Sequence, residues 1–149
     1  MKPVKIAMMG MTHGHTRKYY QTLLDNKKLD WVASCAQDAD AKKTYELYKT
    51  GVPCYLDPEE MYRAHPDIEA VVIASANDQH FAQMKWCAEK GIHILSMKIP
   101  TFDMNEYDEM VAMCDKAGVV CQVELEMHYN AVVRRLKKLV KDGAIGKIK

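Results

Sequence analysis

The stretch VKIAMMGMTHGHT, residues 4–16, joins an apolar run to a turn that contains glycine and then to the start of a helical pattern. Val4–Met9 is short and apolar at every position except Lys5, as expected of a strand that is buried on both faces over most of its length. The helical pattern begins at Thr16. Gly10 ends the strand, and glycine permits the tight turn that leads directly into a helix. This order of strand, turn and helix predicts the first unit of an α/β fold.

The same alternation of apolar strand and helical pattern continues along the chain. Asp57 and Pro58 mark one further short helix, since Asp is a favoured N-cap and Pro fits the first helical position. Gly91 and Gly118 each follow a helix and predict left-handed C-terminal caps. The pattern predicts a single α/β domain with a doubly wound parallel sheet, the Rossmann fold. The expected strands are Val4–Met9, Trp31–Cys35, Ala70–Ser75, His93–Met97 and Val119–Leu125, and the expected helices are Thr16–Leu24, Ala39–Tyr48, Asp78–Lys90, Met104–Ala117 and Ala131–Lys141.

Composition limits the kinds of partner that the chain can have. Its 149 residues are 48% hydrophobic, which is enough to bury the core of one domain. Lys and Arg total 21 against 20 Asp and Glu, and this balance predicts a small-molecule partner rather than nucleic acid. No apolar stretch has the length of a membrane span or a signal sequence, so no membrane association is expected. The five cysteines show no CxxC spacing and are odd in number, which favours free thiols and a cytoplasmic protein.

The turns that follow the strands are the candidate site, because ligands of a doubly wound sheet bind beyond the carboxyl ends of its strands. In the first turn, Gly10 takes the first position of a dinucleotide-binding glycine pattern, and Thr12 and His15 take the other two. The backbone of this turn could hold a pyrophosphate, or the turn could be purely structural. His13 and His15 could also suggest a metal ion, but no third ligand lies nearby in the sequence, so no metal site is expected.

The second turn bears on the choice between NAD and NADP. An acidic side chain after the second strand accepts hydrogen bonds from the adenosine ribose, whereas a basic one favours a 2′-phosphate. Here Ala36 is followed by Gln37 and Asp38, and this sequence leaves NAD and NADP open. Asp38 is also placed to cap the helix that begins at Ala39, and this structural role is the favoured one.

The third and fourth turns are IASANDQH, residues 73–80, and HILSMKIP, residues 93–100. Asn77 or Asp78 could serve only as a helix cap, and His80 only as a first-turn residue. Lys98 is more informative, because it directly follows an apolar strand. That position places it at the ligand edge of the sheet rather than on a solvated helix face.

Four segments, in this order, resemble the N-terminal half of the Gfo/Idh/MocA family of glucose-fructose oxidoreductases and inositol dehydrogenases. They are VKIAMMGMTHGH, SANDQH, GIHILSMKIP and LKKLVKDGAIGKIK. Members of the family are mostly NAD(P)-dependent sugar or polyol dehydrogenases. The third turn of the family usually reads Thr-Pro-Asn, with a histidine three residues on. Asn77 and His80 match this pattern, whereas Ser75 and Ala76 replace the threonine and the proline.

The fourth turn of the family usually reads Glu-Lys-Pro. Lys98 matches the lysine, Met97 replaces the glutamate, and Ile99 takes the place of the proline. The resemblance implies that Lys98 is the catalytic residue, lying beside the nicotinamide and the substrate, where it orients them and assists proton transfer. It also implies NAD or NADP as the cofactor. The residues expected to bind the cofactor are Gly10, Met11, Thr12, His13, His15, Gln37, Ser75, Ala76, Asn77, His80 and Met97.

Residues 1–125 are expected to form the dinucleotide-binding domain, and residues 126–149 the helix and linker that lead to a second, α/β substrate domain absent from this chain. By resemblance, that domain would supply most of the substrate pocket and much of the oligomer interface. The helix Ala131–Lys141 carries an apolar stripe that needs a partner, and KDGAIGKIK is expected to end on a strand with an unpaired edge. We therefore expect a truncated cofactor domain whose exposed apolar surface, around Val119–Leu125 and the last helix, favours a homo-oligomer.

Two functions fit these observations. The resemblance favours the cofactor half of an NAD(P)-dependent oxidoreductase, which transfers hydride between the nicotinamide and a sugar, polyol or related hydroxyl or keto substrate. The methionine at position 97 and the reduced glycine pattern also permit a non-catalytic nucleotide-binding or regulatory module. Lys98 separates the two functions, because only the first requires it.

Overall fold

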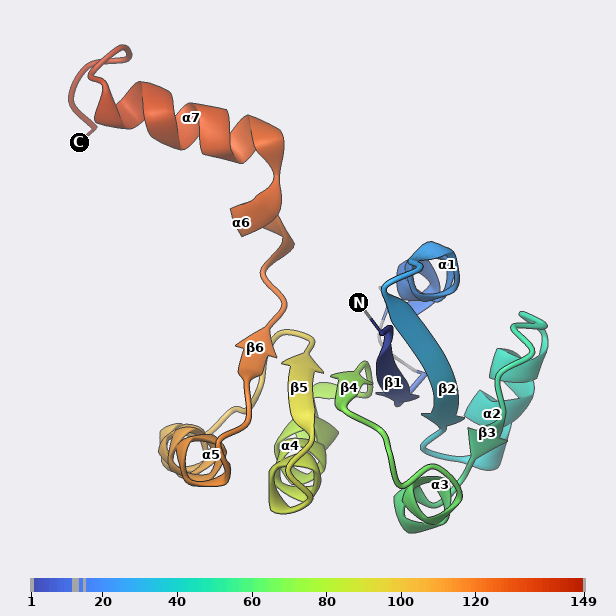
Figure 1. Cartoon of the computed structure of the whole chain (residues 1–149). Helices are drawn as coiled ribbons and strands as arrows, with labels where there is room; N and C mark the ends of the chain where they lie inside the picture. The colour runs from blue at the N-terminus through green and yellow to red at the C-terminus, as the bar shows by residue number, and fades with distance from the viewer. Residues whose placement is uncertain (1, 12–13, 15, 149) are drawn as a thin grey trace.

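The computed structural model describes residues 2–11, 14 and 16–148. A parallel sheet of six strands lies at its centre: β1 (Val4–Met9), β2 (Leu29–Cys35), β3 (Cys54–Tyr55), β4 (Ala70–Ile73), β5 (His93–Ser96) and β6 (Cys121–Val123). The strand order is β3-β2-β1-β4-β5-β6 (Figure 1), so the order reverses between β1 and β4. Three strands run outward on each side of this switch point. The predicted doubly wound α/β fold is confirmed.

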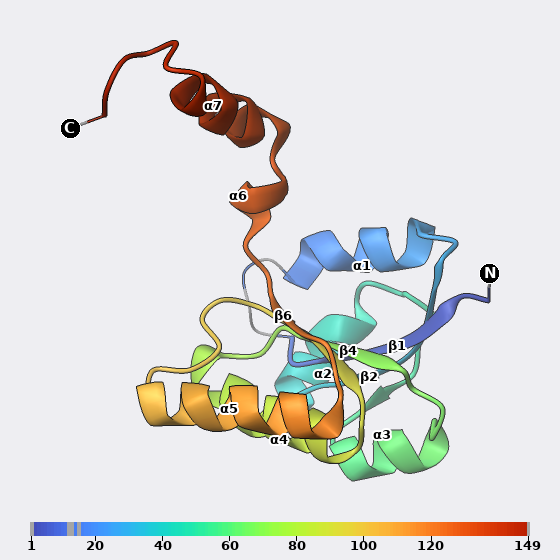
Figure 2. The same ribbon diagram turned by 60° about the vertical axis from the view of Figure 1, so that its left-hand side comes forward.

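Helices cover both faces of the sheet, as Figures 1 and 2 show. Each face of the sheet therefore has its own hydrophobic core. Two helices cover the core on one face, and three helices cover the core on the other. The first pair is α1 (Thr16–Asp25) and α2 (Ala39–Glu46), and the second group is α3 (Pro58–Ala64), α4 (His80–Glu89) and α5 (Met104–Ala117).

Strand β1 shows why the strands are apolar at successive positions. Ile6 and Met8 belong to the core under α1 and α2, whereas Ala7 and Met9 belong to the core under α3, α4 and α5. Neighbouring side chains of a strand point to opposite faces, and here both faces are covered. An alternating apolar and polar pattern would therefore bury polar groups in one of the two cores.

Local capping signals set several helix ends. The Asp38 carboxylate accepts a hydrogen bond from the Ala41 backbone N–H at 2.7 Å, so the favoured structural role of Asp38 is confirmed. Asp57 caps α3 through the N–H of Glu59, as the sequence predicted. Gly118 closes α5 in the left-handed conformation, with φ of 67°.

The structure departs from the expected elements in several places. β3 was not predicted, because a strand of two residues has no detectable periodicity. The expected helix from Asp78 is divided into a turn of 3₁₀ helix, η1 (Asn77–Gln79), followed by α4. The strand expected near the end of the chain is wrong: residues 142–145 are a turn and 146–148 are irregular. Gly143 and Gly146 have φ of 71° and 75° there, values that an extended strand excludes.

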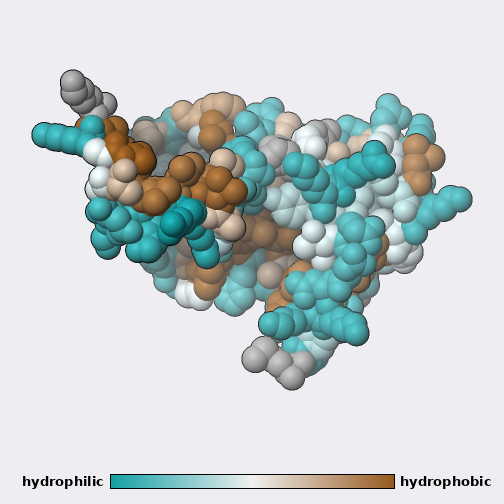
Figure 3. Space-filling model, turned by 90° about the horizontal axis from the view of Figure 1, so that it is seen from above, coloured by the Kyte–Doolittle hydropathy of each residue, from teal (hydrophilic) through white to brown (hydrophobic). Residues whose placement is uncertain are grey.

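The last two helices, α6 (Glu126–Tyr129) and α7 (Ala131–Lys141), stand away from the sheet in both views (Figures 1 and 2). Asn130 caps α7 by accepting hydrogen bonds from two backbone N–H groups. Figure 3 shows hydrophobic side chains along α7 beside a strip of hydrophilic ones. The exposed large apolar residues of α7 and of the residues after it are Val132, Leu136, Val140, Ile145 and Ile148. Among the helices that the structure describes, none has both the length and the apolarity needed to cross a bilayer.

Candidate functional site

The turns after β1, β2, β4, β5 and β6 meet at one edge of the sheet, because all six strands run in the same direction. Backbone hydrogen bonds join neighbouring turns. The N–H of Gly10, after β1, donates to the carbonyl of Cys35 in β2 at 2.9 Å. The N–H of Met97, after β5, donates to the carbonyl of Ile73 in β4 at 3.0 Å. The turns that carry the candidate residues therefore lie next to one another along this edge.

Gly10 lies where the first and third turns approach most closely. Its φ is 75°, and a Cβ atom added to it would lie 2.3 Å from the Cα of Ser75. No other residue type fits this position without moving the backbone. Because Gly10 has no side chain, the first turn can lie close to the end of β4. A turn whose backbone N–H groups bind a pyrophosphate needs such a close approach. This geometry fits a dinucleotide phosphate.

Gln37, in the second turn, contacts the backbone of the first turn. The side-chain oxygen of Gln37 accepts a hydrogen bond from the Met11 backbone N–H at 3.0 Å, so its amide nitrogen remains available as a donor. Gln37 also lines a pocket of about 400 Å³, together with Ala36, Leu56 and Asp78. The pocket lies at the carboxyl ends of β1 and β2, the half of a doubly wound sheet that takes one of the two mononucleotides.

His80 joins the third and fourth turns and is fully buried. Its Nδ1 lies 2.8 Å from the carbonyl oxygen of Ile99, and its Nε2 lies 3.1 Å from that of Ser75. Ser75 is also fully buried, and its hydroxyl donates to the side chain of Gln83 at 2.7 Å. In this structure the side chains of His80 and Ser75 therefore hold the turns, and the surface of the third turn is formed by Ala76, which is exposed, and Asn77, which is half-buried.

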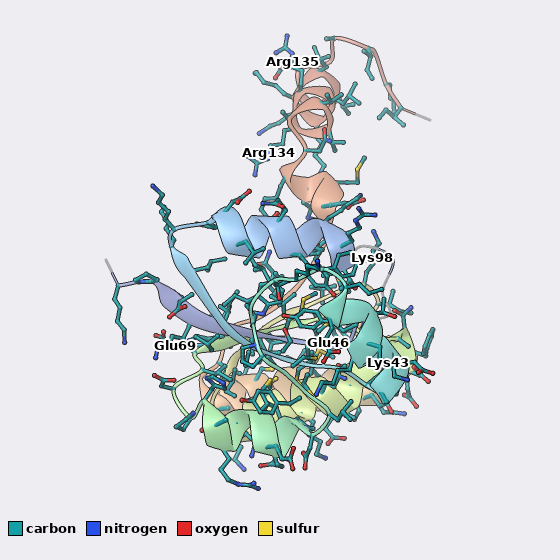
Figure 4. All side chains as sticks on the ribbon, turned by 90° about the vertical axis from the view of Figure 1, so that its right-hand side faces the viewer. Lys43, Glu46, Glu69, Lys98, Arg134 and Arg135 are labelled. Carbon is teal, nitrogen blue, oxygen red and sulfur yellow. The ribbon has the colours of Figure 1, made fainter. Side chains whose placement is uncertain are left out.

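Met97 and Lys98 point in different directions. Met97 is fully buried in the core under α1 and α2, so its side chain supports the fourth turn from below. Lys98 is half-exposed, and its Nζ lies 3.9 Å from a carboxylate oxygen of Glu126. Figure 4 shows Lys98 on the side of the sheet from which α6 and α7 rise. The Lys98–Ile99 peptide bond is cis. A lysine ammonium is thus presented at the ligand edge, with a carboxylate beside it.

The sequence interpretation missed three residues near Lys98. Glu124 directly follows β6, and Glu126 begins α6. Tyr19 comes from α1, and its pKa is raised by burial and by the negative charge of Glu124. The signal that selected Lys98, a charged residue directly after an apolar strand, also applies to Glu124. Glu124 is not a candidate in the sequence analysis, because the expected strand extends to Leu125 and so includes Glu124. In the structure β6 ends at Val123, and Glu124 is the first residue after it.

Three of the predicted cofactor-binding residues, Thr12, His13 and His15, lie outside the described residues. The α-helix that follows them begins at Thr16, whose hydroxyl lies 3.5 Å from the carbonyl oxygen of Ala74. Within the described part of the chain, no group of three or more His, Cys, Asp or Glu side chains has an arrangement that could hold a metal ion.

Comparison with known proteins identifies the family. The sequence model of the Gfo/Idh/MocA oxidoreductase family, NAD-binding Rossmann fold, matches residues 4–125. The 2,7-anhydro-N-acetylneuraminate hydratase of Mediterraneibacter gnavus is 34% identical over 92 residues, which are 62% of this chain and 24% of that protein. The myo-inositol 2-dehydrogenase of Thermotoga maritima is 28% identical over 100 residues, 66% of this chain and 30% of that protein.

The fold of this chain is also similar to that of a solved structure from the same group of enzymes. The crystal structure of myo-inositol 2-dehydrogenase from Lactobacillus plantarum superimposes with a TM-score of 0.87 and 25% identity, over 99% of this chain and 43% of that one. The chain thus spans less than half the length of each of these relatives. The family model that matches the chain describes an NAD-binding Rossmann fold. The chain belongs to the Gfo/Idh/MocA oxidoreductase family and contains the family's NAD-binding Rossmann domain.

Proposed function

We propose that the chain is the cofactor-binding half of an NAD(P)-dependent oxidoreductase that acts on a sugar, a polyol or a related hydroxyl or keto compound. The observation that carries this proposal is the position of Lys98, which lies on the same sheet edge as the close contact between Gly10 and Ser75. The names of the relatives support the substrate class, since they include two myo-inositol 2-dehydrogenases.

In the proposed reaction, the residues of this chain bind and orient the reactants. A nicotinamide dinucleotide held at this edge would supply hydride transfer to or from the substrate carbon. The first turn, at Gly10 and Met11, holds the pyrophosphate by its backbone, and Ala76 and Asn77 border the nicotinamide half of the site. The Lys98 ammonium donates a hydrogen bond to the reacting oxygen and so stabilises the negative charge that develops there.

Calorimetric titration of the chain with NAD+, NADH, NADP+ and NADPH, in the presence of a chelator, tests the cofactor part of the proposal. We expect saturable binding with one site per chain, because the turns that form the cradle are held by hydrogen bonds within residues 10–99. The chelator removes any contribution of a metal ion. Absence of binding by all four compounds would contradict a competent cofactor site and would favour the non-catalytic module.

We further propose that NAD is preferred to NADP. None of the described residues that line the pocket beside Gln37 is basic, and Asp78 places a carboxylate there. Asp38, the next residue after Gln37, adds a second carboxylate at the end of the turn. A 2′-phosphate would meet negative charge without a cation to pair with it.

An Asp38→Ser variant tests this preference, because serine can keep the helix cap while it removes the charge. We expect the affinity for NADP+ relative to NAD+ to rise by about five-fold, as the repulsion of the 2′-phosphate is reduced. Asp40→Ser is the matched control, since Asp40 also lies in the first turn of α2 but is paired with Lys43 in solvent. An equal shift in both variants, measured by calorimetry, would show that Asp38 does not select the cofactor.

We propose that residues 1–125 form the cofactor domain and that residues 126–149 lead to a further substrate domain.

A small molecule, rather than nucleic acid, is the proposed partner, because the positive and negative charges of the chain balance almost completely. All five cysteines are free thiols, and this supports a cytoplasmic location.

We also propose that this chain forms homo-oligomers through the apolar side of α7, where Val132 and Leu136 are 67% and 50% exposed. A Leu136→Gln variant is expected to sediment as a smaller species than the unchanged chain across a concentration series. Arg135→Gln, also on α7 (Figure 4), is the control and should sediment like the unchanged chain. If the unchanged chain is monomeric at all concentrations, this oligomer is excluded.

A further inference from the structure

Glu124 lies in the nicotinamide half of the site. Its backbone N–H donates to the carbonyl of Ser96, the last residue of β5, at 2.7 Å. Ser96 is followed by Met97 and Lys98, so Glu124 lies beside the fourth turn at the carboxyl edge of the sheet. In a doubly wound sheet the strands β4, β5 and β6 form the second mononucleotide-binding half. Because the pocket at Gln37 belongs to the first half, this second half is the one that faces the nicotinamide.

The Glu124 carboxylate is held in a partly buried place. Its Oε2 atom is inaccessible to solvent and has no hydrogen-bond partner in the structure of the described residues. Tyr19, from α1, lies close enough to this side chain for the negative charge of Glu124 to raise its pKa, together with burial. A carboxylate shielded in this way is weakly screened by solvent, so its charge acts over a longer distance than that of a surface residue.

The other charges near the fourth turn leave an excess of negative charge. Lys98 and Glu126 lie 3.9 Å apart, and to a first approximation their opposite charges cancel at a distance. Glu124 adds one further negative charge on the same edge. The neighbouring Tyr19 is a neutral phenol at neutral pH and adds no charge. Asp103 and Glu106, which contact Thr101 just after the fourth turn, add further carboxylates, so negative charge is in excess at this end of the site among the described residues.

We propose that Glu124 biases the bound cofactor toward its oxidised form. The nicotinamide ring is a pyridinium cation in NAD+ and is neutral in NADH, so a nearby carboxylate attracts only the oxidised ring. The inference rests on the proposed function, namely that this edge of the sheet holds a nicotinamide. Glu124 acts through its charge and does not need to touch the cofactor.

The ratio of two dissociation constants, Kd for NAD+ divided by Kd for NADH, tests the inference on the 149-residue chain itself. In a Glu124→Gln variant, which keeps the shape and loses the charge, we expect this ratio to rise by about five-fold. A merely structural role of Glu124 would weaken the binding of both cofactors equally and would leave the ratio unchanged. The matched control is Glu89→Gln, because Glu89 ends α4 at the opposite edge of the sheet and is exposed.

The possible outcomes separate this inference from the proposed function. If the chain binds both cofactors and Glu124→Gln leaves the ratio unchanged or lowers it, the inference is overturned and the proposed function stands. If the chain binds neither cofactor, the proposed function fails and the inference fails with it. If Glu124→Gln does not fold, the Lys98→Met variant can be used instead, and its expected effect on the ratio has the opposite sign. It removes a positive charge from the same edge and is expected to lower the ratio, whereas an unchanged or higher ratio would overturn the inference.

Discussion

A Gly10→Ala variant is expected to lose at least about 3 kcal/mol of folding stability, together with detectable binding of NADH. The added Cβ would lie 2.3 Å from the Cα of Ser75, and the φ of 75° at Gly10 is unfavourable for alanine. Both problems involve the backbone, which cannot move without separating the first turn from the third. Urea unfolding and fluorescence titration with NADH measure the two effects.

Gly51→Ala is the matched control for this experiment. Gly51 has a similar φ of 77°, but an added Cβ would have no atom within 4 Å. The control therefore carries only the conformational cost of alanine, about 1 kcal/mol, and should bind NADH normally. Equal losses of stability in the two variants would show that the approach to Ser75 is not important.

Replacement of Lys98 by alanine is expected to reduce turnover by about 10²- to 10⁴-fold in a protein that contains this domain together with the proposed substrate domain, with little change in the affinity for NADH. The ammonium is proposed to stabilise charge at the reacting oxygen, an interaction made mainly in the transition state. NADH formation with a polyol substrate measures turnover, and calorimetry measures the affinity for the cofactor.

Lys85→Ala is a suitable control for the Lys98 experiment. Lys85 also pairs with a carboxylate, that of Glu109 at 3.0 Å, but this pair joins the surfaces of α4 and α5 away from the strand ends. Turnover in this variant should remain near that of the unchanged protein. If Lys98→Ala also turns over normally, Lys98 has no part in the mechanism, and the nucleotide-binding module without chemistry becomes the better interpretation.

The order of strands and helices could be predicted from the sequence because its causes are local. Apolar runs such as Val4–Met9 are recognisable wherever both faces of a strand are covered, and caps such as Asp57 and Gly118 act within one turn of their own helix. The position of Lys98 at the ligand edge follows from the same local reasoning, because a residue that follows a parallel strand lies at the carboxyl edge.

The side-chain arrangement of the site depends on contacts between distant segments, so only the tertiary structure decided it. His80 is buried because its ring fits between the carbonyls of Ser75 and Ile99, and Met97 is buried because its side chain points into the core beneath α1. The effect of Glu124 on the pKa of Tyr19 depends on the tertiary structure, which brings a residue of α1 near the residue that follows β6. Residues so far apart in the chain come into contact only when the sheet has formed. Such contacts cannot be predicted from local periodicity or propensity.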